Sequence, residues 1–313
     1  MSGLKIIIPG LFTTIQDGGR TGHMASGFSQ CGAMDQDAMY LANILVGNNF
    51  EDAVAEMTLT GLTAKAEKDC LLAITGADAE VFVNGEKTDI NRAVFLKKDD
   101  YITIGQITNG CRCYLAVKGG IDVPEKMGSR STFIKIGMGG FEGRKLQSGD
   151  ILPIKESSEP KNIKDRSVSP DKTDNTVVLR AVAGPQDDMF SEEELDKFFS
   201  REYKVTPSSD RMGIRLEGEE AIVPINGSDI ISDGIVLGSV QVPKNGQPII
   251  LCADRQTTGG YAKIVTVISS DMSKCAQLTP GKTVRFKKVS VEEAQDIRNE
   301  KIKYFKNLKK RIK

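Results

Sequence analysis

Residues 253–263 hold the densest set of polar groups in the chain. They read Ala-Asp-Arg-Gln-Thr-Thr-Gly-Gly-Tyr-Ala-Lys and follow directly on the apolar run 249–252. A short apolar run closed by polar residues is typical of a buried strand, and a second such run follows at 264–268. Two strands that hold a short donor-rich loop fix polar groups in space, so we predict a ligand site here. A plain hairpin, in which Asp254 and Arg255 pair with each other or with neighbours, is the alternative.

Two further loops carry similar groups. Residues 13–23 form a predicted polar loop with hydroxyls, an amide, an acid, a glycine pair and an arginine, and in it Asp17 and Arg20 are alternatively a loop-ordering ion pair. Arg130 lies between two serines behind a glycine, a setting that favours a phosphate or carboxylate through charge-assisted hydrogen bonds, or else a solvated loop. In residues 253–263, the pair Gly259-Gly260 permits unusual backbone angles and a close ligand approach.

Several chemistries are disfavoured by residue type. His23 is the single histidine and the six cysteines are scattered, so a histidine-ligated zinc centre and a Ser-His-Asp triad are nearly excluded and no metal site is expected. The glycine-rich residues 137–144 fail the dinucleotide pattern because Glu142 stands at its last glycine position. Residues 281–283 resemble the end of a phosphate loop, but Ala276 stands where that motif needs its first glycine.

The charges balance, with 42 Lys and Arg residues against 42 Asp and Glu residues in 313. No global field therefore favours a nucleic acid or a membrane surface as a partner. No apolar stretch approaches the ~18 residues of a membrane span, and the first residues lack a signal segment. We therefore expect a soluble cytoplasmic protein.

Short Val, Ile and Leu runs separated by glycine-containing turns predict a mainly β protein with a few short helices. The regular spacing of these runs favours closed or sandwich-like sheets over a parallel βαβ sheet. A helix is predicted at residues 32–47, with Asp35 or its neighbours as the cap, and a capping box at residues 191–194 opens another. Residues 291–313 predict a basic terminal helix that is docked, solvated or frayed.

The composition also predicts the domain organisation. Residues 156–175 are rich in Ser, Pro, Lys, Asp and Glu, which indicates a linker or an exposed loop. We therefore expect an N-terminal β domain at 1–155, a C-terminal β domain at 176–290 and the basic helical tail at 291–313.

Seven stretches in order along the chain resemble the biotin-dependent carboxyltransferase family, of the type found in allophanate hydrolase subunit 2 or in the C component of 5-oxoprolinase. They are residues 14–20, 32–35, 119–124, 128–132, 184–188, 209–213 and 253–263. The resemblance covers about residues 4–288 and gives the basic tail no role. It implies that the two domains are cyclophilin-like β-barrels, in agreement with the strand pattern.

The resemblance further implies ATP-dependent opening of the lactam 5-oxoproline (pyroglutamate) to L-glutamate. The B component of 5-oxoprolinase is the implied direct partner, with the A component in the full enzyme, and ATP with Mg²⁺ is the implied cofactor, with no biotin attached to this chain. An unstrained amide is a poor electrophile, and phosphorylating its oxygen creates a good leaving group. Such a site needs cations and N–H groups around the phosphoryl oxygens, and a carboxylate that orients the substrate N–H or moves a proton.

From these requirements we expect particular residues to act. The expected catalytic residues are Asp17, Asp254, Arg255 and Lys263. The expected substrate- or phosphate-binding residues are Gln16, Arg20, Arg130, Ser131, Asp210, Arg211, Gln256, Thr257, Thr258, Gly259 and Gly260.

Two other functions stay open on the sequence. The same pocket suits a carboxyltransferase that moves CO₂ from carboxybiotin to urea or a related amide, since both reactions polarise an amide. This chain has no biotin-bearing Met-Lys-Met segment and no ATP-grasp portion, so such a reaction needs separate carriers. The third function is not enzymatic: a regulatory protein that binds a kinase or its inhibitor.

Overall fold

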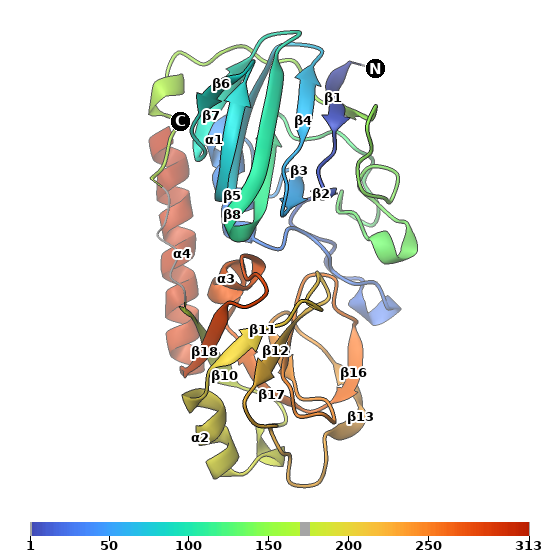
Figure 1. Ribbon diagram of the computed structural model, residues 1–313, viewed down its shortest axis with the longest axis vertical. Coiled ribbons are helices and arrows are strands. Elements are labelled where there is room, and N and C mark those ends of the chain that lie inside the picture. Colours follow the sequence, from blue (N-terminus) through green and yellow to red (C-terminus); the bar gives the residue numbers. More distant parts are fainter. Residues whose placement is uncertain (1, 170–175, 313) are drawn as a thin grey trace. The chain divides into compact units, whose positions relative to one another are not determined.

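The computed structural model describes residues 2–169 and 176–312, which fall into two compact units (Figure 1). Unit 1 comprises Met1–Thr21, Cys31–Thr173 and Tyr304–Lys313, and unit 2 comprises Gly22–Gln30 and Asp174–Lys303. The division is more interleaved than the predicted succession of a domain at 1–155, a linker, a domain at 176–290 and a tail. A short N-terminal segment belongs to unit 2, and the end of the chain belongs to unit 1.

The predicted linker, residues 156–175, is not a free connection as far as the structure describes it. The backbone N–H of Ala93 donates to the carbonyl of Arg166, and the N–H of Val168 donates to the carbonyl of Asn91. Arg166 also donates from Nη1 to the carbonyl of Leu45 at 3.0 Å. Residues 156–169 therefore pack on unit 1, and residues 170–175 of the predicted linker lie outside the described residues.

Unit 1 is built on a nine-stranded, curled sheet in the order β2-β3-β8-β4-β1-β9, in which β5 pairs with β6, β7 and β8. Its strands are β1 Gly3–Ile8, β2 Phe12–Gln16, β3 Val54–Thr58, β4 Thr63–Ala66, β5 Cys70–Val83, β6 Glu86–Thr88, β7 Arg92–Leu96, β8 Tyr101–Val117 and β9 Ile151–Pro153. The 3-10 helices of this unit are η2 Ile134–Ile136 and η3 Ile163–Asp165. All of the strand pairs are antiparallel.

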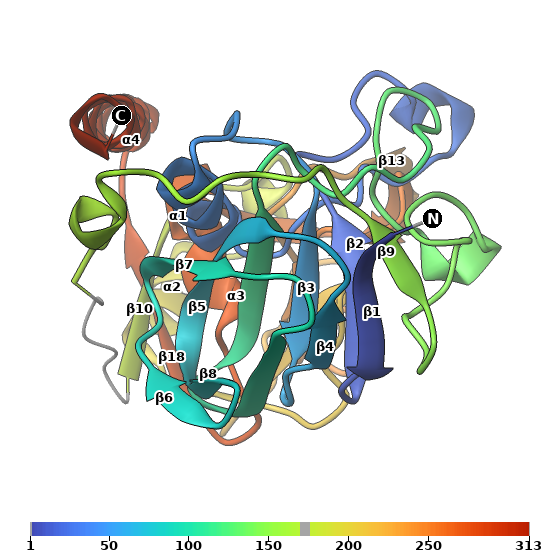
Figure 2. The same cartoon turned by 90° about the horizontal axis from the view of Figure 1, so that it is seen from above.

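Alternate residues of the central strands supply two apolar cores. On β5, Leu72 and its alternate neighbours belong to the core inside the curled sheet, and Leu71 belongs to a second core that includes residues of α1, Gln36–Val46. Figure 2 shows α1 beside β5 and β7. The helix begins where the Asp35 carboxylate accepts a hydrogen bond from the N–H of Ala38, and it ends at Gly47, whose φ is 78°. The helix predicted at 32–47 is confirmed.

The last helix, α4 Val291–Ile312, completes the second core. Its buried residues Phe305, Leu308 and Ile312 recur at helical spacing and belong to the same apolar cluster as α1. The ring of Phe305 meets the ring of Tyr40 edge to face at 5.6 Å. Of the three states predicted for the tail, the docked one therefore applies to its last turns, residues 304–312, whereas none of residues 291–303 is buried.

Unit 2 contains a closed barrel in the order β10-β17-β14-β15-β12-β11-β18. Its strands are β10 Thr176–Ala183, β11 Tyr203–Val205, β12 Gly213–Gly218, β14 Ser239–Gln241, β15 Ile249–Leu251, β17 Lys263–Val267 and β18 Thr283–Lys288. A separate two-stranded sheet pairs β13 Asp229–Gly234 with β16 Thr258–Tyr261. Its helices are α2 Glu192–Ser200, α3 Met272–Ala276 and the first part of α4, residues 291–303, and its 3-10 turns are η1 Met24–Ser26, η4 Asp187–Met189 and η5 Ser269–Asp271.

Helix α2 packs on this barrel through aromatic rings. The ring of Phe198 stacks on the ring of Phe286 with their centroids 4.7 Å apart, and the ring centroid of Tyr203 lies 5.7 Å from that of Phe286. The Ser191 hydroxyl accepts from the N–H of Glu194 at 3.2 Å, which confirms this half of the predicted capping box.

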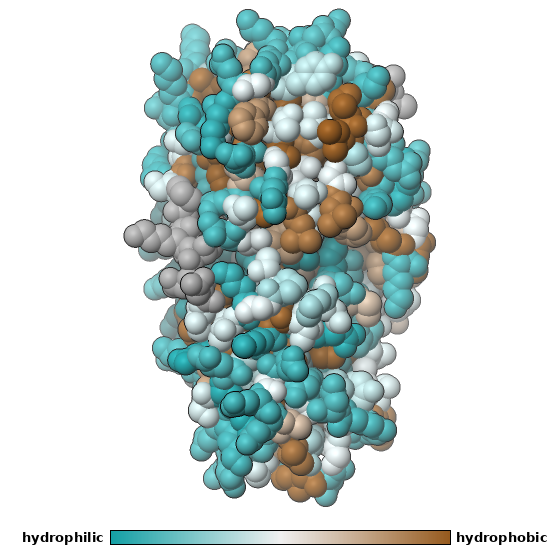
Figure 3. Space-filling model, in the orientation of Figure 1, coloured by the Kyte–Doolittle hydropathy of each residue, from teal (hydrophilic) through white to brown (hydrophobic). Residues whose placement is uncertain are grey.

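The mainly β prediction is confirmed, with one closed barrel and one curled sheet. Two predicted loops are wrong in part, because residues 13–16 belong to β2 and residues 258–261 form β16. Both segments are polar, and cross-strand pairing overrides their weak strand pattern. Among the described residues, no helix has the length and apolarity to cross a membrane. On the face drawn in Figure 3, hydrophilic side chains predominate and apolar ones form small groups.

Candidate functional site

In unit 1, the carboxylate of Asp17 joins two loops. Its Oδ1 accepts hydrogen bonds from the N–H of Gly19 at 2.8 Å and from the hydroxyls of Ser129 and Ser131 at 2.7 and 2.5 Å. Its Oδ2 accepts from the N–H of Arg130 at 2.5 Å. Both oxygens of this carboxylate are thus engaged by donors from the two loops. Asp17 therefore holds residues 128–132 against its own loop.

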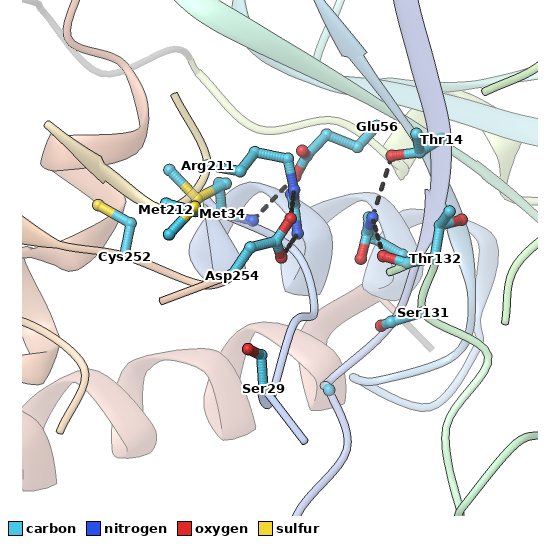
Figure 4. Close-up of polar contacts among 12 residues, drawn as sticks. Thr14, Ser29, Met34, Glu56, Ser131, Thr132, Arg211, Met212, Cys252 and Asp254 are labelled. Carbon is cyan, nitrogen blue, oxygen red and sulfur yellow. Dashed lines mark hydrogen bonds and ion pairs between the residues drawn. The ribbon is translucent and has the colours of Figure 1, made fainter. Parts of the chain in front are cut away.

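Gln16 lies at the end of β2 and is 1% exposed. Its Nε2 donates to the hydroxyl of Thr14 at 3.0 Å and to the carbonyl of Thr132 at 3.2 Å (Figure 4). Its Oε1 is buried and has no hydrogen-bond partner among the described residues. Such an atom is rare inside a folded protein and calls for an explanation.

Arg20 is fully buried, with an exposed fraction of 0%. It donates from Nη2 to the carbonyl of Ser131 at 2.9 Å and from Nε to the carbonyl of Lys126 at 3.3 Å. Its Nη1 has no hydrogen-bond partner among the described residues. The alternative ion pair between Asp17 and Arg20 is wrong, because both groups use other partners.

The side chain of Arg130 binds groups of its own loop. Its guanidinium donates from Nε to the carbonyl of Val123 at 2.8 Å and from Nη1 to Glu125 at 2.5 Å, and its Nη2 lies 3.6 Å from Asp122. The side chain is one-third exposed. The cation predicted to bind phosphate is therefore already balanced by carboxylates of its own loop.

A glycine-rich loop, residues 137–143, covers these groups. A side chain on Gly139 would place its Cβ 2.2 Å from the carbonyl oxygen of Ser131, and one on Gly140 would lie 1.8 Å from the Thr132 hydroxyl. Three non-glycine residues with positive φ also lie in the loops of this region, namely Cys31, Met127 and Glu142. Backbone strain of this kind is often stored at functional sites.

Unit 1 also holds a buried charged group that is not among the residues predicted from the sequence. Glu56 on β3 is 1% exposed and accepts from the N–H of Met34 at 2.8 Å (Figure 4). It also accepts from the hydroxyl of Tyr114 at 2.8 Å, and Nε of Arg112 lies 3.8 Å from its Oε1. Burial, and secondly the Glu56 charge, raises the pKa of Tyr114 well above its usual value, so the phenol stays a donor. A carboxylate inside an otherwise apolar strand was the available signal.

In unit 2, Asp254 pairs with Arg211. The guanidinium donates from Nε to Oδ2 at 2.9 Å and from Nη2 to Oδ1 at 2.8 Å, and Figure 4 shows the two groups face to face. The side chains are 8% and 14% exposed, for Arg211 and Asp254 respectively. This bidentate geometry holds the segment before β12 against the segment after β15. Asp254 thus pairs with a spatial neighbour rather than with Arg255.

Arg255 is 3% exposed, and its guanidinium donates hydrogen bonds to oxygen atoms of the protein. It donates to the carbonyls of Ile235 and Cys252, both at 3.3 Å, and lies 3.5 Å from Oε1 of Gln30. The carbonyl of Arg255 itself accepts from the hydroxyl of Ser29 at 2.7 Å. The segment at residues 22–30, which belongs to unit 2, therefore packs against this arginine.

Lys263, at the start of β17, is 1% exposed. Its ammonium lies 3.0 Å from Oδ2 of Asp233, which is half-exposed. The hydrogen bond from Lys263 lowers the pKa of Asp233, and the N–H of Gly234 adds to this effect. Arg255 and Lys263 therefore reach the same short segment, residues 233–235.

In the glycine pair, Gly259 serves close packing, whereas a Cβ on Gly260 would meet its nearest atom at 3.4 Å. Gly259 pairs with Asp233 across the two-stranded sheet, and a side chain there would place its Cβ 2.6 Å from Cδ1 of Ile235. Gly259 and Gly260 are not among the positive-φ residues, so the expectation of unusual backbone angles is wrong. Thr257 accepts from the N–H of Ile235 through its carbonyl, and Thr258 is the first residue of β16. Nε2 of Gln256 would lie 3.5 Å from a Cβ on Gly259.

Asp210 closes a turn, since its Oδ1 accepts from the N–H groups of Met212 and Gly213. A surface pocket of about 490 Å³ in unit 2 is lined by residues 221–224, 226–229, 243, 244 and 246, and none of the predicted site residues lines it. In the part of the chain that the structure describes, no group of three or more His, Cys, Asp or Glu residues is arranged to hold a metal ion.

The predicted residues thus form two groups, one in each unit. Unit 1 holds Gln16, Asp17, Arg20, Arg130 and Ser131, and unit 2 holds Asp210, Arg211, Asp254, Arg255, Gln256, Thr257, Thr258, Gly259, Gly260 and Lys263. In each group most charged side chains are engaged by protein atoms. The orphaned atoms of Gln16 and Arg20 are the exception among the predicted residues.

Comparison with known proteins gives consistent results. Residues 26–288 match the family described as "Carboxyltransferase domain, subdomain A and B". The chain is 40% identical to the C component of the 5-oxoprolinase of Escherichia coli K12 over 309 residues, which covers 99% of this chain and 98% of that protein. It is 31% identical to urea amidolyase of Saccharomyces cerevisiae, where the match covers 95% of this chain and 17% of that protein. The crystal structure of urea amidolyase from K. lactis matches 97% of the chain with a TM-score of 0.88 and 30% identity, over 20% of that chain.

Proposed function

The chain belongs to the family of the carboxyltransferase domain, subdomain A and B, and from this premise we propose that it is one component of an ATP-dependent 5-oxoprolinase. The complex opens 5-oxoproline to L-glutamate. One observation carries the proposal: the chain is 40% identical to the C component of the Escherichia coli 5-oxoprolinase over nearly the full length of both proteins. The corresponding 5-oxoprolinase component of Haemophilus influenzae is 35% identical over 95% of this chain.

The lengths favour this function over urea carboxylation. The chain spans 98% of the Escherichia coli protein but about a sixth of the two yeast urea amidolyases. A urea-directed reaction would also require the parts of such an enzyme that lie outside the matched region. Carboxyl transfer to urea or a related amide is the second candidate, and regulatory binding without catalysis is the third.

In the proposed reaction, unit 2 supplies Asp254 as the carboxylate that orients the substrate N–H or moves a proton, with Arg255 and Lys263 as the cationic groups. The bidentate pair with Arg211 fixes the orientation of the Asp254 carboxylate, which supports a defined hydrogen-bond direction. Arg255 and Lys263 converge on the same segment, but through protein oxygens. Their proposed contribution is therefore to position residues 233–235.

In unit 1, Asp17 organises the loop that presents Gln16, Arg20 and Ser131, and this role supports substrate binding more directly than proton transfer. ATP with Mg²⁺ is the proposed co-substrate of the complex, and it activates the lactam oxygen as a leaving group. The unpartnered Nη1 of Arg20 fits an anionic oxygen. Mg²⁺ bound with ATP takes one or two carboxylates, waters and phosphate oxygens, so it needs no all-protein cage in this chain.

We propose the B component of 5-oxoprolinase as the direct partner and the A component as the third protein of the complex. The test is reconstitution of the three purified proteins and measurement of glutamate formed from 5-oxoproline. We expect formation that depends on ATP, requires this chain and is insensitive to avidin. Carboxylation of urea with carboxybiotin and no glutamate would support the second function. Binding to the B component with neither activity would support the third.

Variants test the site within the same assay. Asp254→Asn and Arg255→Met are expected to lower glutamate formation by about 10²-fold or more, in the range typical for a group that assists proton transfer or orientation. Asp229→Asn is the matched control, because this acid in the same unit is 62% exposed and pairs with Lys244 on the surface. Wild-type turnover by both Asp254→Asn and Arg255→Met would refute the proposed roles.

A further inference from the structure

Arg20 carries a buried positive charge that protein atoms do not balance. The side chain is 0% exposed, and its two hydrogen bonds go to the neutral backbone carbonyls of Ser131 and Lys126. No ion pair to a carboxylate includes Arg20 among the described residues, and its Nη1 has no hydrogen-bond partner there. A buried charge is costly unless it is paired, so this site favours an anion at Nη1.

Gln16 presents the complementary group. Its Nε2 already donates to the hydroxyl of Thr14 and the carbonyl of Thr132. Because a carbonyl only accepts hydrogen bonds, a rotated amide would set two oxygens against each other, and the orientation is therefore fixed. The Oε1 is left as a buried acceptor without a donor among the described residues.

The two unpartnered groups belong to one loop cluster. Gln16 and Arg20 are each anchored on one of two consecutive carbonyls, those of Thr132 and Ser131. Gly139 of the covering loop lies so close that a Cβ there would be 2.9 Å from Nη2 of Arg20. The loop thus packs bare backbone against the guanidinium.

We propose that Arg20 Nη1 and Gln16 Oε1 form a subsite in unit 1 for a small ligand that carries an oxyanion and an N–H group. The oxyanion accepts from Arg20, and the N–H donates to Gln16. A lactam carboxylate such as 5-oxoproline offers both groups, and a phosphate offers the oxyanion alone. Because both side chains are buried, the ligand enters as the glycine-rich loop at 137–143 shifts. The subsite deepens the proposed function, but it rests on burial and hydrogen bonding, and it is tested by binding rather than by turnover.

The experiment measures ligand binding to the full chain by calorimetry, with thermal unfolding as a second readout. The probes are 5-oxoproline, its neutral analogue 2-pyrrolidone, and inorganic phosphate, with sodium chloride at matched ionic strength. We expect 5-oxoproline to bind at least about tenfold more tightly than 2-pyrrolidone, since only the former carries the oxyanion. Binding of phosphate without 5-oxoproline would assign the same subsite to a phosphoryl group. Binding of neither would overturn the proposal.

The variant Arg20→Met distinguishes a ligand site from a structural arginine. We expect it to weaken binding at least about tenfold while leaving stability in ligand-free buffer equal or higher, because an unbalanced buried charge is removed. The matched control is Arg166→Met, a second buried arginine of unit 1 that donates to the carbonyl of Leu45 and to Asn162. This control is expected to keep wild-type affinity, because Arg166 contacts neither Gln16 nor the carbonyls of Ser131 and Thr132 in its printed hydrogen bonds. Unchanged affinity in Arg20→Met would overturn the proposal.

A structure of the wild-type chain crystallised with 5-oxoproline gives an answer even where Arg20→Met fails to fold. We expect a ligand oxygen within hydrogen-bond distance of Arg20 Nη1 and the ligand nitrogen against Gln16 Oε1. A water molecule at Nη1, with the ligand elsewhere, would refute the subsite. Glutamate formation in the reconstituted complex is measured separately, so binding without turnover would contradict the proposed reaction and leave the subsite standing.

Discussion

Replacing Asp17 by asparagine separates a loop-organising carboxylate from a catalytic one. In the native chain, Oδ1 accepts from the N–H of Gly19 and the hydroxyls of Ser129 and Ser131, and Oδ2 accepts from the N–H of Arg130. Asparagine keeps one oxygen but directs an N–H at the amide of Arg130. One hydrogen bond is therefore lost, and the other three lose the charge of their acceptor.

The size of the effect follows from these four contacts. A hydrogen bond to a charged group contributes about 1.5–3 kcal/mol to folding and a neutral one about 0.5–1.5 kcal/mol. The lost bond and the three weakened bonds together cost about 5 kcal/mol. Asp17 is 9% exposed, so the folded native chain also carries the desolvation cost of its charge. Removing the charge removes that cost and offsets part of the lost free energy of unfolding. We therefore expect Asp17→Asn to lower the free energy of unfolding by about 3 kcal/mol.

The assay is urea denaturation of the full chain, followed by turnover in the reconstituted complex. The control is Asp122→Asn, whose carboxylate is 62% exposed and 3.6 Å from Arg130. An exposed ion pair of this kind is worth less than about 1 kcal/mol, so the control stays close to wild type. The loop-organising role of Asp17 is refuted if the unfolding free energy of Asp17→Asn lies within about 0.5 kcal/mol of the control value while turnover falls about a hundredfold. In that case the carboxylate acts in the chemistry.

Three further outcomes are expected. Phe305→Ala is expected to lower the free energy of unfolding by about 3 kcal/mol in urea denaturation, because loss of the buried ring leaves a cavity. The variant Lys306→Ala, at the exposed neighbouring position, is expected to stay within about 0.5 kcal/mol of wild type. Equal unfolding free energies for the two variants would mean that the end of α4 does not dock. Burial raises the pKa of Asp271, but hydrogen bonds from Arg180 outweigh this effect, and the pKa lies below its usual value. The stability that the charged Asp271 adds to the folded chain is therefore present at neutral pH and is lost as the pH falls below about 4. Asp271→Asn is expected to flatten this acid limb in a series of denaturation curves, and an unchanged limb would contradict the assignment. Gly139→Ala, at φ 71° and with a backbone oxygen 2.2 Å from the new Cβ, is expected to destabilise the chain by more than about 1 kcal/mol and to weaken binding of 5-oxoproline, as calorimetry would show.

The periodic elements were predictable because their signals are local. Asp35 and Gly47 mark both ends of α1, and Ser191 with Glu194 marks the start of α2. A cap needs only residues within one turn, so the sequence contains all that the prediction requires. The β class was likewise visible in short apolar runs, although polar strands such as β2 and β16 were interpreted as loops.

The residue types of the candidate site were also visible in the sequence, but their partners were not. Adjacent residues Asp254 and Arg255 suggested an ion pair, whereas Asp254 pairs with Arg211, 43 positions earlier. The carboxylate of Asp17 bonds to Ser131, 114 positions away, rather than to nearby Arg20. Contacts at such separations depend on which strands pair and in which register, and no single segment encodes that choice.

By itself, the sequence determined that the chain is mainly β, that its acids, amides and arginines gather in glycine-rich loops, and that seven of its stretches resemble one family. Only the tertiary structure decided which of those groups are satisfied by the protein and which are left over. Burial and hydrogen-bond completeness are properties of the packed chain, because an atom loses water only when distant segments close around it. That is why Arg20 and Arg130 looked alike as potential anion binders in the sequence, and why the structure assigns the unpartnered donor to Arg20.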